Sequence, residues 1–232
     1  MLILALHTAP ACEVASQGSG EWWDKEWRTG FHKQAQEGPR WLGYQGFRGD
    51  EVADTRYHGG VDKAVCVYAS EHLDYWRALP GLGEMASGAF GENLSTQGLT
   101  EEEACIGDIY QIGEALVQVS QPRQPCWKLA RRWRVKDLAA QVERNGKTGF
   151  YFRVLQHGHV SAGDGIELRE RVWPQWSIAR SNAIMHHGEG GAEAARELSE
   201  CPLLSGSWKD GLWMMSQSAR RKDTSTRTNQ PS

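Results

Sequence analysis

Cys126 is the side chain of this sequence best suited to act as a nucleophile or as a soft metal ligand. It directly follows Pro125 and lies three residues after Arg123, within residues 121–128 (QPRQPCWK). Apolar residues at helical spacing over residues 126–133 (CWKLARRW) predict a helix that begins at Cys126. A helix N-terminus and a nearby guanidinium both favour a thiolate. The spacing is equally consistent with a small buried hydrophobic residue, which most free cysteines are.

Two glycine-containing corners carry further polar side chains. His58 precedes Gly59 and Gly60, and glycines that adopt positive φ allow backbone N–H groups to approach an anion closely. Glu92 and Asn93 lie side by side in a second corner. The first corner is either a ligand cradle or two turns in series. Glu92 is either an acid–base group or a turn carboxylate bonded to the backbone.

Two further cations lie in polar segments of the chain. Residues 8–40 are rich in glycine, proline and polar residues, and loops of this length are usually functional or disordered. Lys33, at the end of residues 28–33 (RTGFHK), and Arg56, just before His58, offer charges that can meet an anion. A solvated polar loop is the simpler interpretation of this composition.

The composition limits the class of protein. The 232 residues include 26 basic and 29 acidic side chains, a balance that disfavours nucleic-acid binding and favours a small-molecule or protein partner. Five cysteines at irregular spacing, with no CxxC pair, predict a reducing compartment rather than a disulfide framework or structural zinc. Residues 1–6 (MLILAL) are too short for a signal sequence, and no apolar run is long enough to span a membrane. We therefore expect a soluble, cytoplasmic protein that does not bind membranes.

Short alternating strands dominate the first three quarters of the chain. They are separated by Gly-Asp turns at a density that predicts a mainly β fold, a barrel rather than a doubly wound sheet. The expected strands are residues 1–6, 41–46, 64–68, 109–112, 115–119, 150–155 and 166–168. Residues 71–79 and 136–144 are expected to form flanking helices, the second ending at the left-handed stop Asn145-Gly146.

The pattern changes near residue 171. Residues 177–185, 189–198 and 205–215 then read as three short helices, followed by a polar tail without apolar periodicity. We divide the chain into a β-barrel domain (1–170), a three-helix accessory domain (171–215) and a disordered tail (216–232).

Taken together, the motifs resemble the MOSC domain. The motifs that carry the resemblance are residues 58–65 (HGGVDKAV), 90–94 (FGENL), 106–108 (IGD) and 122–126 (PRQPC), in this order. Residues 117–123 (VQVSQPR), residues 126–129 (CWKL) and the C-terminal helices also resemble the stand-alone YiiM-type members of that family. The resemblance covers roughly residues 1–215.

The resemblance implies a β-barrel that binds molybdenum cofactor (molybdopterin), with Cys126 as the protein ligand to molybdenum. It also implies reduction of N-hydroxylated compounds such as 6-hydroxylaminopurine to amines. A thiolate suits a transition metal, and the cofactor's phosphate needs basic side chains and backbone N–H groups. The cofactor-binding residues are expected to be Lys33, Arg56, His58, Gly59, Gly60, Asn93, Arg123 and Cys126. The candidate proton donors are Glu92, His58 and Asp62, and the sequence does not choose between them.

The electrons for such a reduction must come from outside the chain. The sequence has no flavin or nicotinamide fingerprint and no cysteine set for an iron–sulfur cluster, so we expect an external flavoprotein donor. The sequence does not determine the oligomeric state, and an oligomer is possible. An alternative is a non-catalytic carrier of the cofactor, or of sulfur as a persulfide, that uses the same Cys126. A purely structural barrel is a third possibility.

Overall fold

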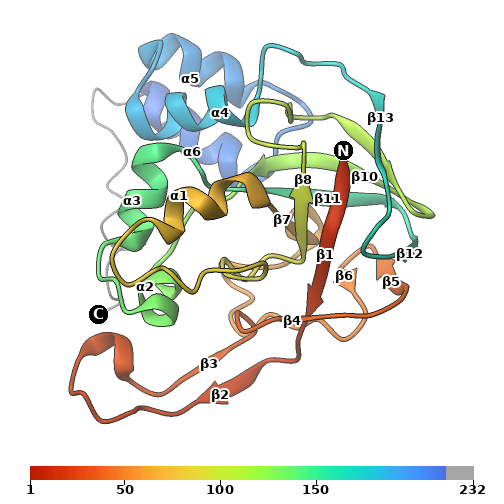
Figure 1. Ribbon diagram of the computed structural model, residues 1–232. Coiled ribbons are helices and arrows are strands. Elements are labelled where there is room, and N and C mark those ends of the chain that lie inside the picture. The colour runs from red at the N-terminus through yellow and green to blue at the C-terminus, as the bar shows by residue number, and fades with distance from the viewer. Residues whose placement is uncertain (218–232) are drawn as a thin grey trace.

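A curled mixed sheet of eight strands forms the centre of the molecule (Figure 1). The structure, a computed structural model, describes residues 1–217. The strand order is β13-β9-β10-β11-β7-β8-β1-β4, and the β7–β8 pair is parallel. The strands are β1 (Leu2–Thr8), β4 (Gln34–Ala35), β7 (Val65–Ala69), β8 (Leu94–Gln97), β9 (Ile109–Ile112), β10 (Ala115–Pro122), β11 (Phe150–Gln156) and β13 (Ile166–Glu170).

The two ends of this sheet meet at one corner. Leu2 at the start of β1 forms a bridge with Gly165, and the N–H of Ile166 donates to the carbonyl of Met1 at 3.0 Å. The sheet is therefore a half-barrel that is joined at this corner. The predicted mainly β, barrel-type fold with flanking helices is confirmed.

Residues 8–40 are more regular than the sequence suggests. They contain a hairpin of β2 (Cys12–Val14) and β3 (Trp27–Thr29), at the bottom of Figure 1, before β4 joins the main sheet. A further small sheet combines β5 (Arg40–Gly43), β6 (Gly46–Phe47) and β12 (Gly158–Val160). Short strands with little apolar alternation gave no clear signal, because pairing with distant segments defines them.

Three short helices cover a second apolar core beside the sheet. They are α1 (Leu73–Arg77), α2 (Lys128–Trp133) and α3 (Leu138–Asn145). Their buried side chains, such as Trp76 and Leu129, pack with Tyr68 of β7 and with Phe90. As predicted, α3 ends at Gly146, which has a φ of 72°.

The C-terminal helices share the core of the sheet. They are α4 (Ile178–Asn182), a π-helical turn (Ala183–His187), α5 (Gly191–Ser199) and α6 (Gly206–Gln217), shown in blue in Figure 1. Trp176 and Trp208 belong to the same apolar cluster as the strands, and the N–H of Ile106 donates to the carbonyl of Trp176 at 2.8 Å. The C-terminal helices therefore pack into the same core as the strands. The domain boundary at residue 171 stays a prediction.

The predicted tail begins two residues too early, since Ser216 and Gln217 belong to α6. Both extra residues are polar, and Oγ of Ser216 donates to the carbonyl of Trp213 at 2.7 Å in this last turn. The rest of the predicted tail lies outside the described residues.

Trp208→Ala is expected to lower the free energy of unfolding by about 3–5 kcal/mol, because the indole is fully buried in the shared core. Trp213→Ala, on the same helix but with 51% of its surface exposed, should change it by less than about 0.5 kcal/mol. Urea unfolding of the two full-length variants measures both values. Equal effects would show that α6 does not contribute to the core of the sheet.

Candidate functional site

A cavity of about 110 Å³ lies where β7, the loop after β10 and residues 30–33, 50–64 and 91–93 meet. The predicted site residues that line it are Lys33, His58, Gly59, Asn93, Arg123 and Cys126. The predicted residues outside its lining are Arg56, Gly60, Asp62 and Glu92. The structure therefore gathers most of the predicted set, drawn from segments far apart in sequence.

Cys126 lies in the loop between β10 and α2, with 8% of its surface exposed. The prediction that it begins the helix is wrong, because α2 starts at Lys128. The backbone carbonyl of Cys126 instead accepts a turn hydrogen bond from the N–H of Leu129 at 3.1 Å. The favourable charges near the thiol come from side chains, Arg123 and Lys128, both of which line the cavity with it. Both charges stabilise a thiolate electrostatically.

Arg123 is buried, with 6% of its surface exposed, and its guanidinium has no carboxylate partner among residues 1–217. Its backbone N–H donates to the carbonyl of Gly149 at 3.0 Å, which fixes the loop. The guanidinium carbon lies 5.9 Å from the ring centre of Phe31, and the buried Nη1 has no hydrogen-bond partner in the described part of the chain. Buried charges in proteins are normally paired. Nη1 of Arg123 is therefore a buried donor available to an acceptor in the cavity, and its role toward a cofactor stays a prediction.

Lys128 adds a second cation on the other side of Cys126. It is buried, and no carboxylate lies within 4.0 Å of its ammonium in residues 1–217. Burial lowers the pKa of Lys128, against the opposing attraction of a Cys126 thiolate and of Asp54. Arg123 and Lys128 thus place near the thiol two basic groups that form no ion pair with the described residues, an arrangement that favours an anionic ligand.

Lys33 is already paired inside the cavity wall. Its ammonium contacts the carboxylate of Asp50, and both side chains are nearly buried. Asp50 also accepts a hydrogen bond from Nδ2 of Asn93 at 2.8 Å, while Oδ1 of Asn93 accepts from the N–H of Cys66 at 3.0 Å. Lys33 and Asn93 therefore line the cavity, but their polar groups are already bonded to other residues of the chain. Their role toward a cofactor stays a prediction.

His58 is half-buried in the cavity wall as a neutral imidazole. Burial, together with the charges of Lys128, Lys63 and Arg123, lowers the pKa of His58 to about 3. Gly59 has the positive φ of 74° that the corner requires, whereas Gly60 (φ 84°) turns away from the cavity. A histidine that is neutral at pH 7 accepts or donates hydrogen bonds and does not supply a proton from an imidazolium.

This lowered pKa gives a test by acid unfolding. Between pH 6.5 and about 3 the unfolded chain binds a proton at His58 that the folded chain does not, so stability falls as the pH falls through this window. The free energy of unfolding of His58→Gln should therefore fall less steeply than that of the wild type, by up to about 1.4 kcal/mol per pH unit. Urea unfolding at several pH values measures this slope. His157→Gln, at an exposed position without a carboxylate partner in residues 1–217, should keep the wild-type slope. A wild-type slope in His58→Gln would contradict the assignment.

Two predicted residues are bound elsewhere. The side chain of Arg56 is 80% exposed and pairs with Asp54 at 3.2 Å. The carboxylate of Asp62 forms a 2.9 Å ion pair with Arg153 of β11. Arg56 is held by a partner two residues away, and Asp62 by a partner on a strand. The sequence motif reveals neither partner.

Glu92 is a turn carboxylate. It is 1% exposed and accepts hydrogen bonds from the N–H of Gly88 at 2.6 Å, the N–H of Phe90 at 2.9 Å and Oγ of Ser95 at 2.8 Å. These bonds hold the corner that presents Asn93 to the cavity. Of the two interpretations of Glu92, the structure favours the carboxylate bonded to backbone.

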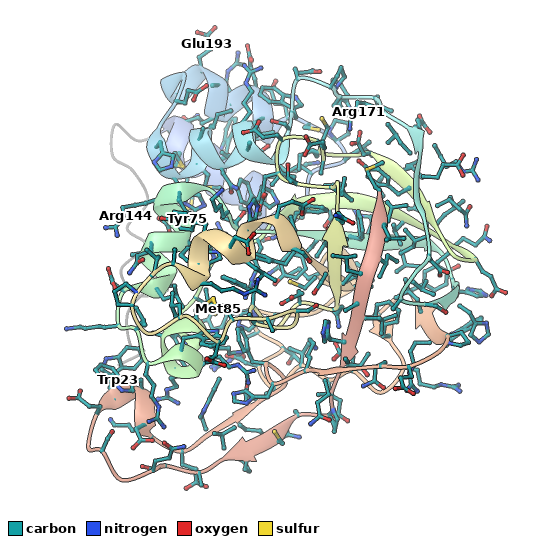
Figure 2. The ribbon with its side chains drawn as sticks, viewed as in Figure 1. Trp23, Tyr75, Met85, Arg144, Arg171 and Glu193 are labelled. Atoms are coloured by element: carbon teal, nitrogen blue, oxygen red, sulfur yellow. The ribbon has the colours of Figure 1, made fainter. Side chains whose placement is uncertain are left out.

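Glu92→Gln is expected to lower the free energy of unfolding by about 1–3 kcal/mol, because one backbone donor then faces an amide N–H₂. Cofactor-loaded molecules should keep their turnover. Thermal unfolding and a rate normalised to bound metal measure the two effects. Glu193→Gln, at the outer surface of α5 in Figure 2, is the matched control. Wild-type stability with lost turnover would instead make Glu92 an acid–base group.

The sequence did not predict Cys66 and Tyr151 as site residues. They are opposite each other on β7 and β11, they line the cavity, and their side chains are hydrogen-bonded. Burial raises the pKa of the Cys66 thiol. Every residue of β7 is buried, so the alternation that would mark Cys66 as facing a cavity is hidden. Cys66 therefore shares the cavity with Cys126 although no pattern in the sequence indicates it.

Comparison with known proteins identifies the family. The MOSC domain profile matches residues 54–167, and the profile of the YiiM-like 3-alpha helix domain matches residues 176–212. Protein YiiM of Escherichia coli strain K12 is 40% identical over 184 residues, which cover 78% of this chain and 82% of YiiM. The chain belongs to the MOSC family, in its YiiM-type group. The predicted resemblance is confirmed.

Other MOSC relatives extend this result. The uncharacterized protein YflK of Bacillus subtilis strain 168 is 44% identical over 185 residues, 80% of this chain and 83% of YflK. The crystal structure of YiiM from Escherichia coli has a TM-score of 0.79 at 31% identity and covers 99% of this chain and 100% of that one. A protein of Gibberella moniliformis named "Reductase" is 36% identical over 180 residues, 75% of this chain but 32% of that longer protein.

In residues 1–217 of our chain, no helix has the length and apolar character needed to cross a membrane.

Proposed function

We propose that this MOSC protein binds molybdenum cofactor at Cys126 and reduces N-hydroxylated compounds, such as 6-hydroxylaminopurine, to amines. The observation that carries this proposal is the buried, unpaired guanidinium of Arg123 in the cavity of Cys126. Family membership and the name of the fungal relative, Reductase, support it. The five free cysteines agree with the reducing conditions of the cytoplasm, the location we propose.

The residues of the cavity fit the cofactor. The cofactor's phosphate is an anion. Arg123, Lys128 and Lys63 are the cavity cations without a carboxylate within 4.0 Å among the described residues, and of these Lys63 donates to the carbonyl of Tyr57 at 2.8 Å. Cys126 offers a soft thiolate ligand. Within residues 1–217 no three His, Cys, Asp or Glu side chains gather into a metal site, so the described residues do not supply a complete ligand set.

When bound, the cofactor supplies two electrons at its metal. The reduction consumes two electrons and two protons, and the amine nitrogen takes one of these protons from solvent. The chain's own residues would then have three tasks: Cys126 would hold the metal, Arg123 would bind the anionic part, and another group would deliver the second proton to the hydroxyl that leaves as water. The neutral His58 and the hydrogen-bonded Glu92 are poorly suited to the last task. Lys128 suits it better, because burial lowers its pKa toward the working pH and its ammonium lies in the cavity.

The electrons are proposed to come from a separate flavoprotein. The proposal is tested on full-length protein purified from a molybdate-fed host that makes the cofactor. Molybdenum content is measured first, then reduction of 6-hydroxylaminopurine with a chemical donor and with a flavoprotein reductase. Bound molybdenum with turnover supports the enzyme, and bound molybdenum without turnover supports the carrier function. Protein from a molybdate-free culture is the control and should be inactive.

A further inference from the structure

A second cavity, of about 250 Å³, lies between the end of α3, helix α4 and residues 100–102. It shares no lining residue with the cavity at Cys126. Figure 2 labels Arg144, which belongs to α3 and lines this cavity. The polar lining residues used below are His72, Glu101, Arg144, Asn145, Lys147 and Asn182.

Two acidic residues line this cavity, the exposed Glu102 and the buried Glu101, and the buried one already has its partners. The carboxylate of Glu101, which is buried, lies 2.6 Å from Nε2 of His72 and accepts the N–H of Gly149 at 2.6 Å. The ammonium of Lys147 lies 3.5 Å from Nδ1 of His72 and 5.6 Å from the ring centre of Tyr75. Lys147 has no carboxylate within 4.0 Å in residues 1–217. The cavity therefore presents an ammonium without a counter-ion.

Two further polar atoms in the cavity lack partners. Nδ2 of Asn145 is a buried donor and Oδ1 of Asn182 a buried acceptor, neither with a hydrogen-bond partner in the described part of the chain. Asn182 is 1% exposed, and its Nδ2 donates to Oγ1 of Thr148 at 2.8 Å, which fixes the orientation of its amide. Buried polar groups are normally hydrogen-bonded. A matching ligand brings acceptors for Lys147 and Asn145 and an O–H donor for Asn182.

We propose that this second cavity binds a small oxyanion that retains a hydroxyl group, of which monohydrogen phosphate is the simplest. Arg144 adds a cation at the rim. Its side chain is 69% exposed, and its ion pair with Asp137 is long, at 3.7 Å. Sulfate has the same shape and charge but carries no proton at neutral pH. It therefore leaves Oδ1 of Asn182 facing another acceptor, and a site built to receive a hydroxyl rejects an analogue that lacks it.

The second cavity is connected to the loop of Arg123. Gly149 donates its N–H to Glu101, and its carbonyl accepts both the N–H of Arg123 at 3.0 Å and Oγ1 of Thr148 at 2.8 Å. Thr148 in turn accepts from Asn182. An anion bound at Lys147 thus restrains residues 145–149, the segment that anchors Arg123. The anion site itself does not depend on the function proposed for Cys126.

Amide NMR of the full-length chain, titrated with phosphate and separately with sulfate at pH 8 and constant ionic strength, tests the proposal. Phosphate is expected to shift the amides of residues 145–149 and Asn182 saturably, with sulfate at least about 10-fold weaker. Phosphate bound at the first cavity is distinguished by shifts at Gly59 and Cys126. Lys147→Gln should weaken phosphate binding at residues 145–149 at least about 10-fold, and Lys136→Gln, an exposed charge on the preceding loop, should leave it unchanged.

No saturable shift at residues 145–149 up to about 10 mM phosphate would overturn the proposal. Equal affinity for phosphate and sulfate would also overturn it, as would equal effects of the two lysine variants. The comparison of the two anions uses the wild-type chain, so it remains decisive if Lys147→Gln does not fold.

Discussion

Cys126→Ser is expected to fold like the wild type and to lose at least about 100-fold in reduction of N-hydroxylated substrates. Changes in the surroundings of a metal ligand already cost about 10–100-fold, and here the ligand itself is replaced. A serine alkoxide forms less readily than a thiolate and is a harder ligand, less suited to this metal. Circular dichroism, metal content and turnover per bound metal measure the effect.

Cys12→Ser is the matched control, because Cys12 is exposed on β2 and does not line the cavity. It should keep the wild-type rate. Cys66→Ser is the informative third variant, since Cys66 lines the same cavity beside Tyr151. Turnover at the native rate by folded, metal-loaded Cys126→Ser would overturn the assignment.

Arg123→Met is expected to separate cofactor binding from stability. The substitution removes a buried cation without a partner in residues 1–217, so the cofactor-free chain should be as stable as the wild type or more stable, by up to about 4 kcal/mol. The same change removes the proposed contact to the cofactor's phosphate, and molybdenum occupancy should fall about 10- to 100-fold. Urea unfolding of cofactor-free protein and metal analysis of protein from a cofactor-competent host measure the two effects.

Arg169→Met, at an exposed position on β13 paired with Glu167, should alter neither quantity. If Arg123→Met keeps full molybdenum occupancy and only the apparent substrate affinity falls, then Arg123 faces the substrate. If the cofactor-free variant is strongly destabilised, the guanidinium has a structural partner and the anion assignment is wrong.

The sequence predicted the fold well where hydrophobic alternation and turn residues agree. Strands β9 and β13 and the end of α3 at Gly146 follow from local patterns of this kind. The hairpin of β2 and β3 was missed because its pairing rests on contacts between segments, not on alternation. The shared core of sheet and C-terminal helices was also missed, since an amphipathic helix does not reveal which surface it covers.

For the site, the motifs supplied Cys126, Arg123 and His58, but not what each side chain contacts. Glu92 and Asp62 lie inside matched motifs, yet one holds a turn and the other pairs with Arg153. Lys128 was passed over because its position, two residues after Cys126, places it in the cavity only through the turn that precedes α2. Such partners depend on tertiary contacts that a single sequence does not contain.

Molybdenum-edge X-ray absorption of cofactor-loaded wild type and Cys126→Ser tests the central claim most directly, that Cys126 holds the metal of the cofactor. We predict that the wild type shows one molybdenum–sulfur contact more than the dithiolene of the cofactor supplies, and that the loaded fraction of Cys126→Ser lacks it. Identical sulfur coordination in the two proteins would contradict the account.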